Sequence, residues 1–450
     1  MIDFSTEKAW LRPFRNARKL LLGRTVQAVL SVGYLALATR ALGVADFGIL
    51  TLVHATIILL GKIASFQAWQ MVMRYGARAM TNKNPAHLKK IIMFALRLEV
   101  IAALVGIAVV WLLSGPLASL FSIPPEYTVA FKAYAFLLVF ILASHVAKGC
   151  LQLTDRHDLM AWQLAATPVF RVMGAGFLFL TGGGLVGFLV VWFFASALAR
   201  LLQVFLAWRN MAGHIKALRQ EAKETMPIMP PSGRFGAPEA GLWKYLWGTH
   251  ANSSIGIDLA PMLVASVLGP TGAGLMRVAQ KIGAIVGYPV NKLLAPVIYT
   301  DMTWLTAQGE SKHRRSMIFK TGAVTGLFSL LVVALIITFG REIITFIAGA
   351  EFVGAYGAMV MVGLATVLGA FSFGLAPMLV TAGKVWRVSA IQLAALGVFV
   401  LITPPLVVWL GVTGAGVAFF IRTALYVTLL GFVSRKLLRK KPAKTPEDKA

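Results

Sequence analysis

The sequence predicts an all-α, polytopic membrane protein with about twelve transmembrane helices, arranged as two six-helix bundles around a central cleft. Three observations lead to this prediction: the composition, the recurrence of long apolar runs, and a pattern that repeats half a chain apart. The chain has 450 residues, of which 58% are hydrophobic and only 13% charged, with a mean hydropathy of +0.77. In a typical soluble domain about a quarter of the residues are charged. This composition therefore places most of the chain in a bilayer.

The apolar runs are each long enough to cross a hydrocarbon core of roughly 30 Å. Gly, Pro and charged residues separate them into twelve spans. The spans cover approximately residues 20–41, 47–68, 91–113, 129–151, 159–180, 184–207, 246–267, 272–298, 317–339, 355–381, 387–409 and 414–433. The segment 1–19 is polar and basic, and the run after it is too long for the apolar part of a signal peptide. We therefore expect no cleavable signal sequence.

The basic residues fix the direction of the spans. Lys and Arg occur in the N-terminal segment 1–19, in the connections after even-numbered spans and in the tail 434–450. The connections after odd-numbered spans are almost free of them, with Arg341 as the exception. Because cytoplasmic connections accumulate Lys and Arg, we expect both termini in the cytoplasm.

The positive net charge of the chain does not indicate a nucleic-acid partner. The chain carries 43 Lys and Arg against 17 Asp and Glu, a formal charge of +26. In a membrane protein such an excess follows from topology and from attraction to anionic membrane lipids. The single cysteine, Cys150, lies in an apolar run, so an internal disulfide is excluded and no thiolate site is indicated.

A short pattern occurs twice. The stretch LGVADFGIL begins at Leu42 and LGPTGAGLM begins at Leu268, 226 residues later. The same offset aligns HLKKII with HRRSMI, and a slightly different one aligns LTGGGLVG with LGVTGAGV. The repeat predicts two bundles of the same orientation, 20–207 and 246–433, related by an axis along the membrane normal. Two such bundles enclose a cleft at mid-membrane, which is the architecture of a transporter.

The longest polar segment, 208–245, joins the two predicted bundles on the cytoplasmic side. Met211, Ile215 and Leu218 share one helical face there, so we expect an interfacial amphipathic helix. The stretch MPIMPPSGRFGAP then breaks the helix with Pro and Gly.

The stretch ATRALGVADFGIL, from Ala38 to Leu50, resembles a signature that follows the first helix of polysaccharide and O-antigen flippases. These proteins belong to the multidrug/oligosaccharidyl-lipid/polysaccharide exporter superfamily, and the resemblance extends to the six-plus-six helix plan of the whole chain. It implies an alternating-access carrier in the bacterial cytoplasmic membrane that moves an undecaprenyl-pyrophosphate-linked oligosaccharide to the outer leaflet. The partners it implies are that lipid-linked glycan, membrane lipids, a polysaccharide polymerase and a chain-length regulator.

Ionisable residues inside spans are the candidate site residues, because burying a charge in a bilayer is costly. Span eight carries a basic stripe on one helical face, flanked by Gln280 and Asn291. Its members are Arg277, Lys281, Tyr288 and Lys292. We expect the stripe to face the cleft and bind a diphosphate or anionic sugars. The alternative for Arg277 and Lys292 is that they extend to the membrane surface.

Further candidate cations lie on other spans. Span two contributes Lys62 and His54, span five contributes Arg171, and Arg40 belongs to the flippase signature. Pairing with neighbouring groups is the structural alternative for Lys62 and Arg171, and interface anchoring is the alternative for Arg40. On span seven, Asp258 either binds a coupling ion or balances the charge of span eight. We expect no catalytic residue, metal or cofactor.

Other classes of function fit the sequence less well. No G-x-x-x-x-G-K-[ST] phosphate loop is present, which disfavours an ATP-driven pump. A membrane polymerase or glycosyltransferase needs a large outer loop or a soluble catalytic domain, and the predicted outer loops are short and poor in acids. A multidrug exporter of the same superfamily and a flippase for another lipid-linked precursor remain open.

Overall fold

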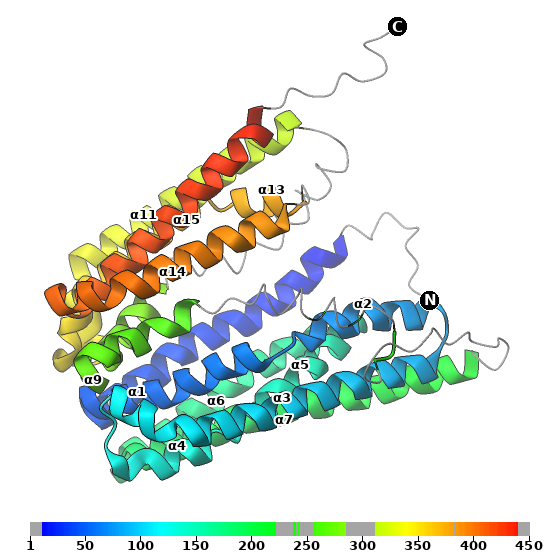
Figure 1. Cartoon of the computed structure of the whole chain (residues 1–450), viewed down its shortest axis with the longest axis horizontal. Coiled ribbons are helices and arrows are strands. Elements are labelled where there is room, and N and C mark those ends of the chain that lie inside the picture. Colours follow the sequence, from blue (N-terminus) through cyan, green and yellow to red (C-terminus); the bar gives the residue numbers. More distant parts are fainter. Residues whose placement is uncertain are drawn as a thin grey trace, which may run out of the picture. The chain divides into compact units, whose positions relative to one another are not determined.

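The computed structural model describes residues 11–221, 237–239, 242, 246, 256–284, 311–381 and 384–439, and these form helices joined by short turns, with no strand among them (Figure 1). The chain divides into two compact units, Arg18–Met262 and Leu263–Ala450 together with Met1–Ala17. The two-bundle boundaries expected from the sequence stay a prediction.

The N-terminal unit is built from long helices joined by short turns. Its elements are α1 (Leu11–Ala64), α2 (Ala68–Thr81), α3 (Pro85–Leu120), η1 (Pro125–Tyr127), α4 (Thr128–Tyr134), α5 (Leu137–Leu153), α6 (His157–Thr181) and α7 (Leu185–Glu221). Helix α7 continues past the predicted span into the predicted linker. There Met211 and Leu218 are buried while Lys216 and Arg219 are exposed, as on an amphipathic helix.

The C-terminal unit is also built largely from long helices. Its elements are α9 (Gly256–Gly283), which enters this unit at Leu263, then α11 (Ser311–Ile347), η6 (Ala350–Ala355), α12 (Tyr356–Phe371), α13 (Leu375–Thr381), α14 (Val385–Leu410) and α15 (Val412–Arg439). Arg422 of α15 lies over the rings of Phe399 and Phe419, 5.7 and 5.6 Å from their centroids, so aromatic faces screen this intramembrane charge.

Ten continuous segments among the described residues are long and apolar enough to span a membrane. The difference from the twelve predicted spans has a simple cause. The segment Val26–Thr81 covers most of the first predicted span and all of the second. The segment Leu259–Gly283 covers the adjoining ends of spans seven and eight, which extend into residues outside the described ranges. Ten continuous segments are therefore compatible with twelve crossings.

Two glycines of the repeated pattern make matching kinks. Gly43 interrupts α1 with φ 69° and ψ −178°, and Gly269 interrupts α9 with φ 65° and ψ −163°. Figure 1 shows α1 as two legs that meet at a sharp turn. Positive φ with extended ψ is open almost only to glycine, because a Cβ would clash with the backbone. The repeated Leu-Gly pair is thus a repeated backbone turn.

Helix α1 ends earlier than the predicted second span. Residues 65–67 are not helical, and Gln67 adopts the left-handed conformation with φ 56° before α2 begins. This break inside an apolar stretch was not predicted from the sequence, because neither Pro nor Gly marks it.

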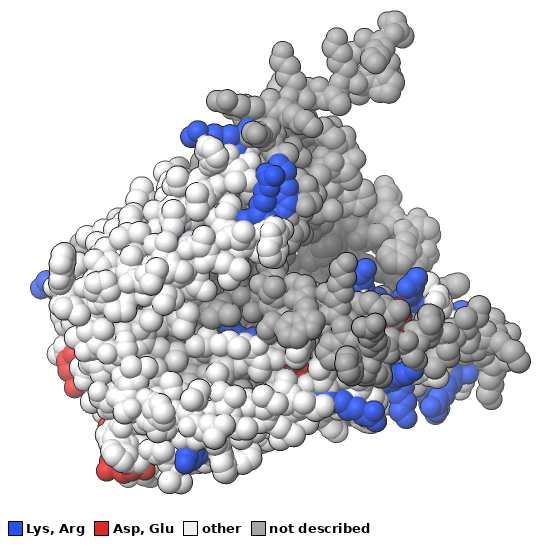
Figure 2. All heavy atoms as spheres, viewed as in Figure 1, with Lys and Arg blue, Asp and Glu red and all other residues white. Residues whose placement is uncertain are grey.

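The flanks of both units are apolar and exposed, as expected where a helix meets lipid. Leu112, Leu180 and Trp409 are among the large hydrophobic side chains left uncovered. Figure 2 shows the flank of the N-terminal unit as largely white, with Lys and Arg gathered near the ends of α2 and α7. The exposed basic residues there include Arg78, Lys83, Lys216 and Arg219.

Candidate functional site

A buried cluster of polar and aromatic side chains surrounds Arg171 in the N-terminal unit. Arg171 stands near the middle of α6 and is only 7% exposed. Its Nη2 donates to His54 Nε2 at 3.2 Å and to Ser196 Oγ at 3.0 Å. This contact brings together two of the candidate residues named from the sequence, Arg171 and His54.

The hydrogen bonds fix the protonation state of His54. A guanidinium can only donate, so Nε2 of His54 must accept and the ring hydrogen must sit on Nδ1. That Nδ1 lies 2.8 Å from Tyr134 Oη and donates to it. His54 is consequently a neutral imidazole that connects the Arg171 guanidinium to a buried phenol at the end of α4.

Aromatic rings, rather than a counter-ion, pack against the guanidinium of Arg171. Arg171 Cζ lies 5.4 Å from the ring centroid of Tyr34 and 4.9 Å from that of Trp192. The two rings themselves meet edge to face at 5.3 Å. Within the described part of the chain no carboxylate lies within ion-pair distance of Arg171, and its Nε has no hydrogen-bond partner. The cation is thus kept in place by neutral groups and retains an unused donor.

Arg200 extends this cluster along α7. Its Nη1 donates to the carbonyl oxygen of Ser196, one helical turn earlier, at 3.2 Å. The hydroxyl of the same serine accepts the hydrogen bond from Arg171. Sequence reasoning missed Arg200, although a charge inside predicted span six is a signal of the same kind as Arg171. Tyr34, Tyr134 and Trp192 were also missed, and nothing in their spacing sets them apart from packing residues.

The remaining candidate residues of the N-terminal unit do not join the cluster. Lys62 is half-buried near the end of α1, about two helical turns beyond His54, and Arg40 is exposed. Lys148, which lies on α5, stacks on an aromatic ring, with Nζ 4.1 Å from the Trp69 centroid.

The predicted basic stripe is described only in part. Arg277 and Lys281 follow the kink of α9 and are half-buried one turn apart, on one face of the C-terminal unit's first helix. Tyr288 and Lys292 fall outside the described residues. Asp258 lies in the first turn of α9, but its side chain also falls outside them, so its role stays a prediction.

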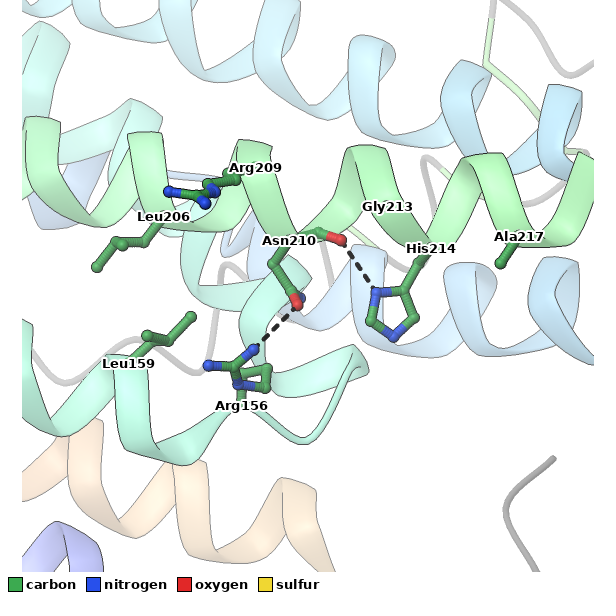
Figure 3. Close-up of a pocket in the computed structure, with 8 residues that line it drawn as sticks. All are labelled: Arg156, Leu159, Leu206, Arg209, Asn210, Gly213, His214 and Ala217. Atoms are coloured by element: carbon green, nitrogen blue, oxygen red, sulfur yellow. Dashed lines mark hydrogen bonds between the residues drawn. The ribbon is translucent and has the colours of Figure 1, made fainter.

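A polar pocket of about 600 Å³ opens where α6 begins and α7 leaves the apolar region. Figure 3 shows Arg156 pointing to Asn210, and the ring of His214 facing the carbonyl oxygen of Asn210. The distance from His214 Nδ1 to that oxygen is 3.0 Å. Arg156 also donates to the carboxylate of Asp158 at 2.9 Å, and this hydrogen bond raises the pKa of its guanidinium. Because Arg156 is already paired with Asp158, this pocket is a weaker binding site for an anion than the Arg171 cluster is.

A second cavity, of about 520 Å³, lies between α3, α5 and α7. Its walls are almost entirely apolar and include the buried Cys150 and the exposed Trp208. Lys89, Lys216 and Arg219 also line it, and all three are exposed. The cavity thus combines an apolar interior with a cationic rim, which suits an amphiphile with an anionic head.

Comparison with known proteins identifies the fold. No family model matches the chain. The inner membrane protein YghQ of Escherichia coli K12 is 26% identical over 363 residues, which cover 76% of this chain and 94% of that protein. The inward-facing structure of a multidrug resistance MATE family transporter of the MOP superfamily matches with a TM-score of 0.73 at 14% identity, over 93% of this chain and 96% of that one.

Two other solved structures extend this comparison. The lipid II flippase MurJ, in an inward closed conformation, matches with a TM-score of 0.65 at 13% identity, over 92% of this chain and 87% of that one. A MOP superfamily transporter from Pyrococcus furiosus matches with a TM-score of 0.59 at 15% identity, over 98% of this chain and all of that one. The chain is therefore a multi-pass membrane protein with the fold of MOP superfamily transporters. This confirms the predicted fold class.

Proposed function

We propose that this protein is an alternating-access flippase that carries an undecaprenyl-pyrophosphate-linked oligosaccharide across the bacterial cytoplasmic membrane. The observation that carries the proposal is the buried guanidinium of Arg171, which has neutral partners and no carboxylate within ion-pair distance in the described part of the chain. An unneutralised cation inside a bilayer is costly unless an anion visits it. A diphosphate is such an anion, and a planar guanidinium is well matched to it.

The other intramembrane charges favour the same class of substrate. Arg277 and Lys281 are half-buried cations on α9, and Lys62 is a third on α1. A carrier for cationic drugs would need several acids in the membrane. Among the described residues of the predicted spans, Glu99 is the one acid that is buried. We place these cations along the path of the diphosphate through the predicted cleft, with Tyr288, Lys292, Arg40 and His54 as further contacts.

The apolar cavity between α3, α5 and α7 suits the isoprenoid units that adjoin the diphosphate of the substrate. A volume of about 520 Å³ lies within the range of specific ligand sites. The cations Lys89, Lys216 and Arg219 line the same cavity, so an isoprenoid chain inside would leave its phosphate near positive charge. MurJ is named as a flippase for lipid II, and the Escherichia coli relative is named as an inner membrane protein. Both support the class of substrate and the membrane proposed here.

Loss of two cations tests this function in cells. We expect Lys281→Ala and Lys62→Ala to abolish glycan export while protein abundance stays near normal, because each removes a charge that the diphosphate meets in a low-dielectric region. Export of labelled surface glycan is measured beside an immunoblot of the membrane fraction. The matched control is Lys320→Ala, which removes an exposed lysine of α11. Wild-type export by both variants would exclude these lysines as substrate contacts, and loss of the protein itself would assign them a structural role.

A further inference from the structure

A buried carboxylate outside the Arg171 cluster has no role in the function proposed above. Glu99 lies on α3 and is 0% exposed. Its Oε1 accepts from Ser65 Oγ at 3.1 Å and from the backbone N–H of Ala68 at 3.1 Å, whereas its Oε2 has no hydrogen-bond partner. A buried carboxylate with an unsatisfied oxygen is costly to maintain in the ionised form. Such a group needs an explanation beyond packing.

Glu99 holds the break between α1 and α2. Ala68 is the first residue of α2, so its N–H belongs to the free amides of a helix start, and the carboxylate of Glu99 takes the place of a capping side chain. The residue before it, Gln67, is held in the left-handed conformation with φ 56°. The strained turn is therefore fastened to α3 through one carboxylate oxygen.

A chain of hydrogen bonds leads from Glu99 towards a partly exposed imidazole. Ser65 Oγ donates its only hydrogen to Glu99, so it must accept from His145 Nδ1, which lies 2.8 Å away. The side chain of His145 is 29% exposed. We propose that Glu99 is a proton-binding site, loaded from His145 through Ser65, and that its protonation is coupled to substrate movement.

The transfer is balanced without any further reactant. A proton arriving at Nε2 of His145 makes the ring an imidazolium. The Nδ1 proton then moves to Ser65 Oγ as the Ser65 hydroxyl proton moves to Glu99 Oε1. The products are a neutral His145 with its hydrogen on Nε2 and a neutral carboxylic acid at Glu99.

Protonation of Glu99 loosens the helix break. A carboxylate is a stronger acceptor for a helix-start amide than a protonated carboxyl oxygen is. Once Oε1 carries the proton, the bond from the Ala68 N–H weakens, and the turn at Gln67 loses its fastening to α3. Proton binding at Glu99 therefore favours release of the strained turn at Gln67 from α3.

The same helix carries this change to the Arg171 cluster. His54 belongs to the second half of α1, and Ser65 directly follows the last residue of that helix, Ala64, about three turns further along the chain. Arg200 gives a second connection, because its charge acts on both His145 and Tyr134. A shift of α1 relative to α3 would thus alter the hydrogen bond between His54 and Arg171. The coupling to substrate rests on the proposed function, whereas the proton site itself does not.

The charges around the relay are positive. The cations that act on His145 are Lys148 of α5 and Arg200 of α7. Their positive charge opposes a further positive charge on the ring of His145. The imidazolium is then a short-lived carrier, and the proton rests on Glu99.

Infrared difference spectroscopy of the purified full-length protein tests the proton site without any substrate. We expect acidification from mildly alkaline pH to produce a protonated-carboxyl band in the wild type. That band should be missing in Glu99→Gln, whose amide oxygen can still accept from Ala68. It should persist in the matched control Glu126→Gln, which changes an exposed acid of η1.

A pH-jump version of the measurement tests the relay. We expect Ser65→Ala to keep the band but to slow its appearance about tenfold or more, and Ser65→Thr to restore the rate with its hydroxyl. A band that survives in Glu99→Gln, or a wild-type rate in Ser65→Ala, would overturn the proposal. Because no substrate is present, the result is independent of the proposed function. Failure of lipid-linked oligosaccharide translocation in proteoliposomes would refute that function and leave the proton site standing.

Discussion

Replacement of Arg171 by glutamine is the most informative single change in the N-terminal unit. If the guanidinium binds the diphosphate of the substrate, Arg171→Gln removes one partner of a buried, hydrogen-bonded charge pair. Such a truncation costs about 2–5 kcal/mol of binding free energy. A value near 3 kcal/mol weakens binding about 100-fold, since each 1.4 kcal/mol is a factor of about ten.

The same substitution has a much smaller expected effect on folding. Two hydrogen bonds from a charged donor, to His54 and to Ser196, are lost, at about 1.5–3 kcal/mol each. Against this, a buried charge disappears, and its desolvation penalty is several kcal/mol. The two terms are of similar size and opposite sign. We therefore expect the melting temperature of Arg171→Gln to stay close to that of the wild type.

The binding assay can use a fluorophore already in the site. Trp192 lies 4.9 Å from Arg171, so its emission should respond when a short-chain polyprenyl diphosphate binds in detergent. Arg171→Lys keeps the charge without the planar fork and should bind with intermediate affinity. Arg97→Gln, the same change at an exposed arginine of α3, is the control. Folded Arg171→Gln that binds within about threefold of wild type would refute the role assigned to Arg171.

Three further predictions follow from the backbone, the topology and the driving force. Alanine in place of Gly43 or Gly269 should lower the free energy of unfolding by about 1–2 kcal/mol, because each glycine has positive φ. Gly176→Ala should not lower it, because Gly176 has open space around it. Thermal unfolding measures the difference. In a Cys150→Ala background, an impermeant thiol reagent applied to intact cells should label cysteines replacing Asp46, Gly182 or Val412 and spare one replacing Ser232; labelling of the last would overturn the twelve-span topology. Asp258→Asn should slow translocation into proteoliposomes if Asp258 balances charge, and complete loss together with a strict ion requirement would instead make it the coupling site.

The sequence was sufficient for the parts of the structure that depend on composition and on glycine. The apolar runs marked the helices because length and hydropathy alone decide what crosses a bilayer. The repeated Leu-Gly pair located the kinks at Gly43 and Gly269, since that backbone conformation is restricted to glycine. Arg171 and His54 were named as candidates because any ionisable side chain in a span is conspicuous.

The parts that depend on contacts between helices were not accessible in this way. The break at residues 65–67 carries no Pro or Gly and is held from outside by Glu99, which comes more than thirty residues later. Spacing along one helix cannot show that Ser65, Glu99 and His145 meet. No role was therefore assigned to Glu99 from the sequence. The same reason explains why Tyr134 and Trp192 were not predicted as partners of the Arg171 site.

The central claim is that the protein moves an anionic lipid-linked oligosaccharide through a cationic path. It is tested most directly by fluorescent undecaprenyl-pyrophosphate-linked oligosaccharide in proteoliposomes with an imposed membrane potential. Each negative charge moved releases about 2.3 kcal/mol per 100 mV. We expect translocation to accelerate when the potential draws the anion across, to slow when the potential is reversed, and to be lost in Arg171→Gln. Translocation that ignores the sign of the potential and persists in Arg171→Gln, or transport of a cationic drug in place of the glycolipid, would contradict the account.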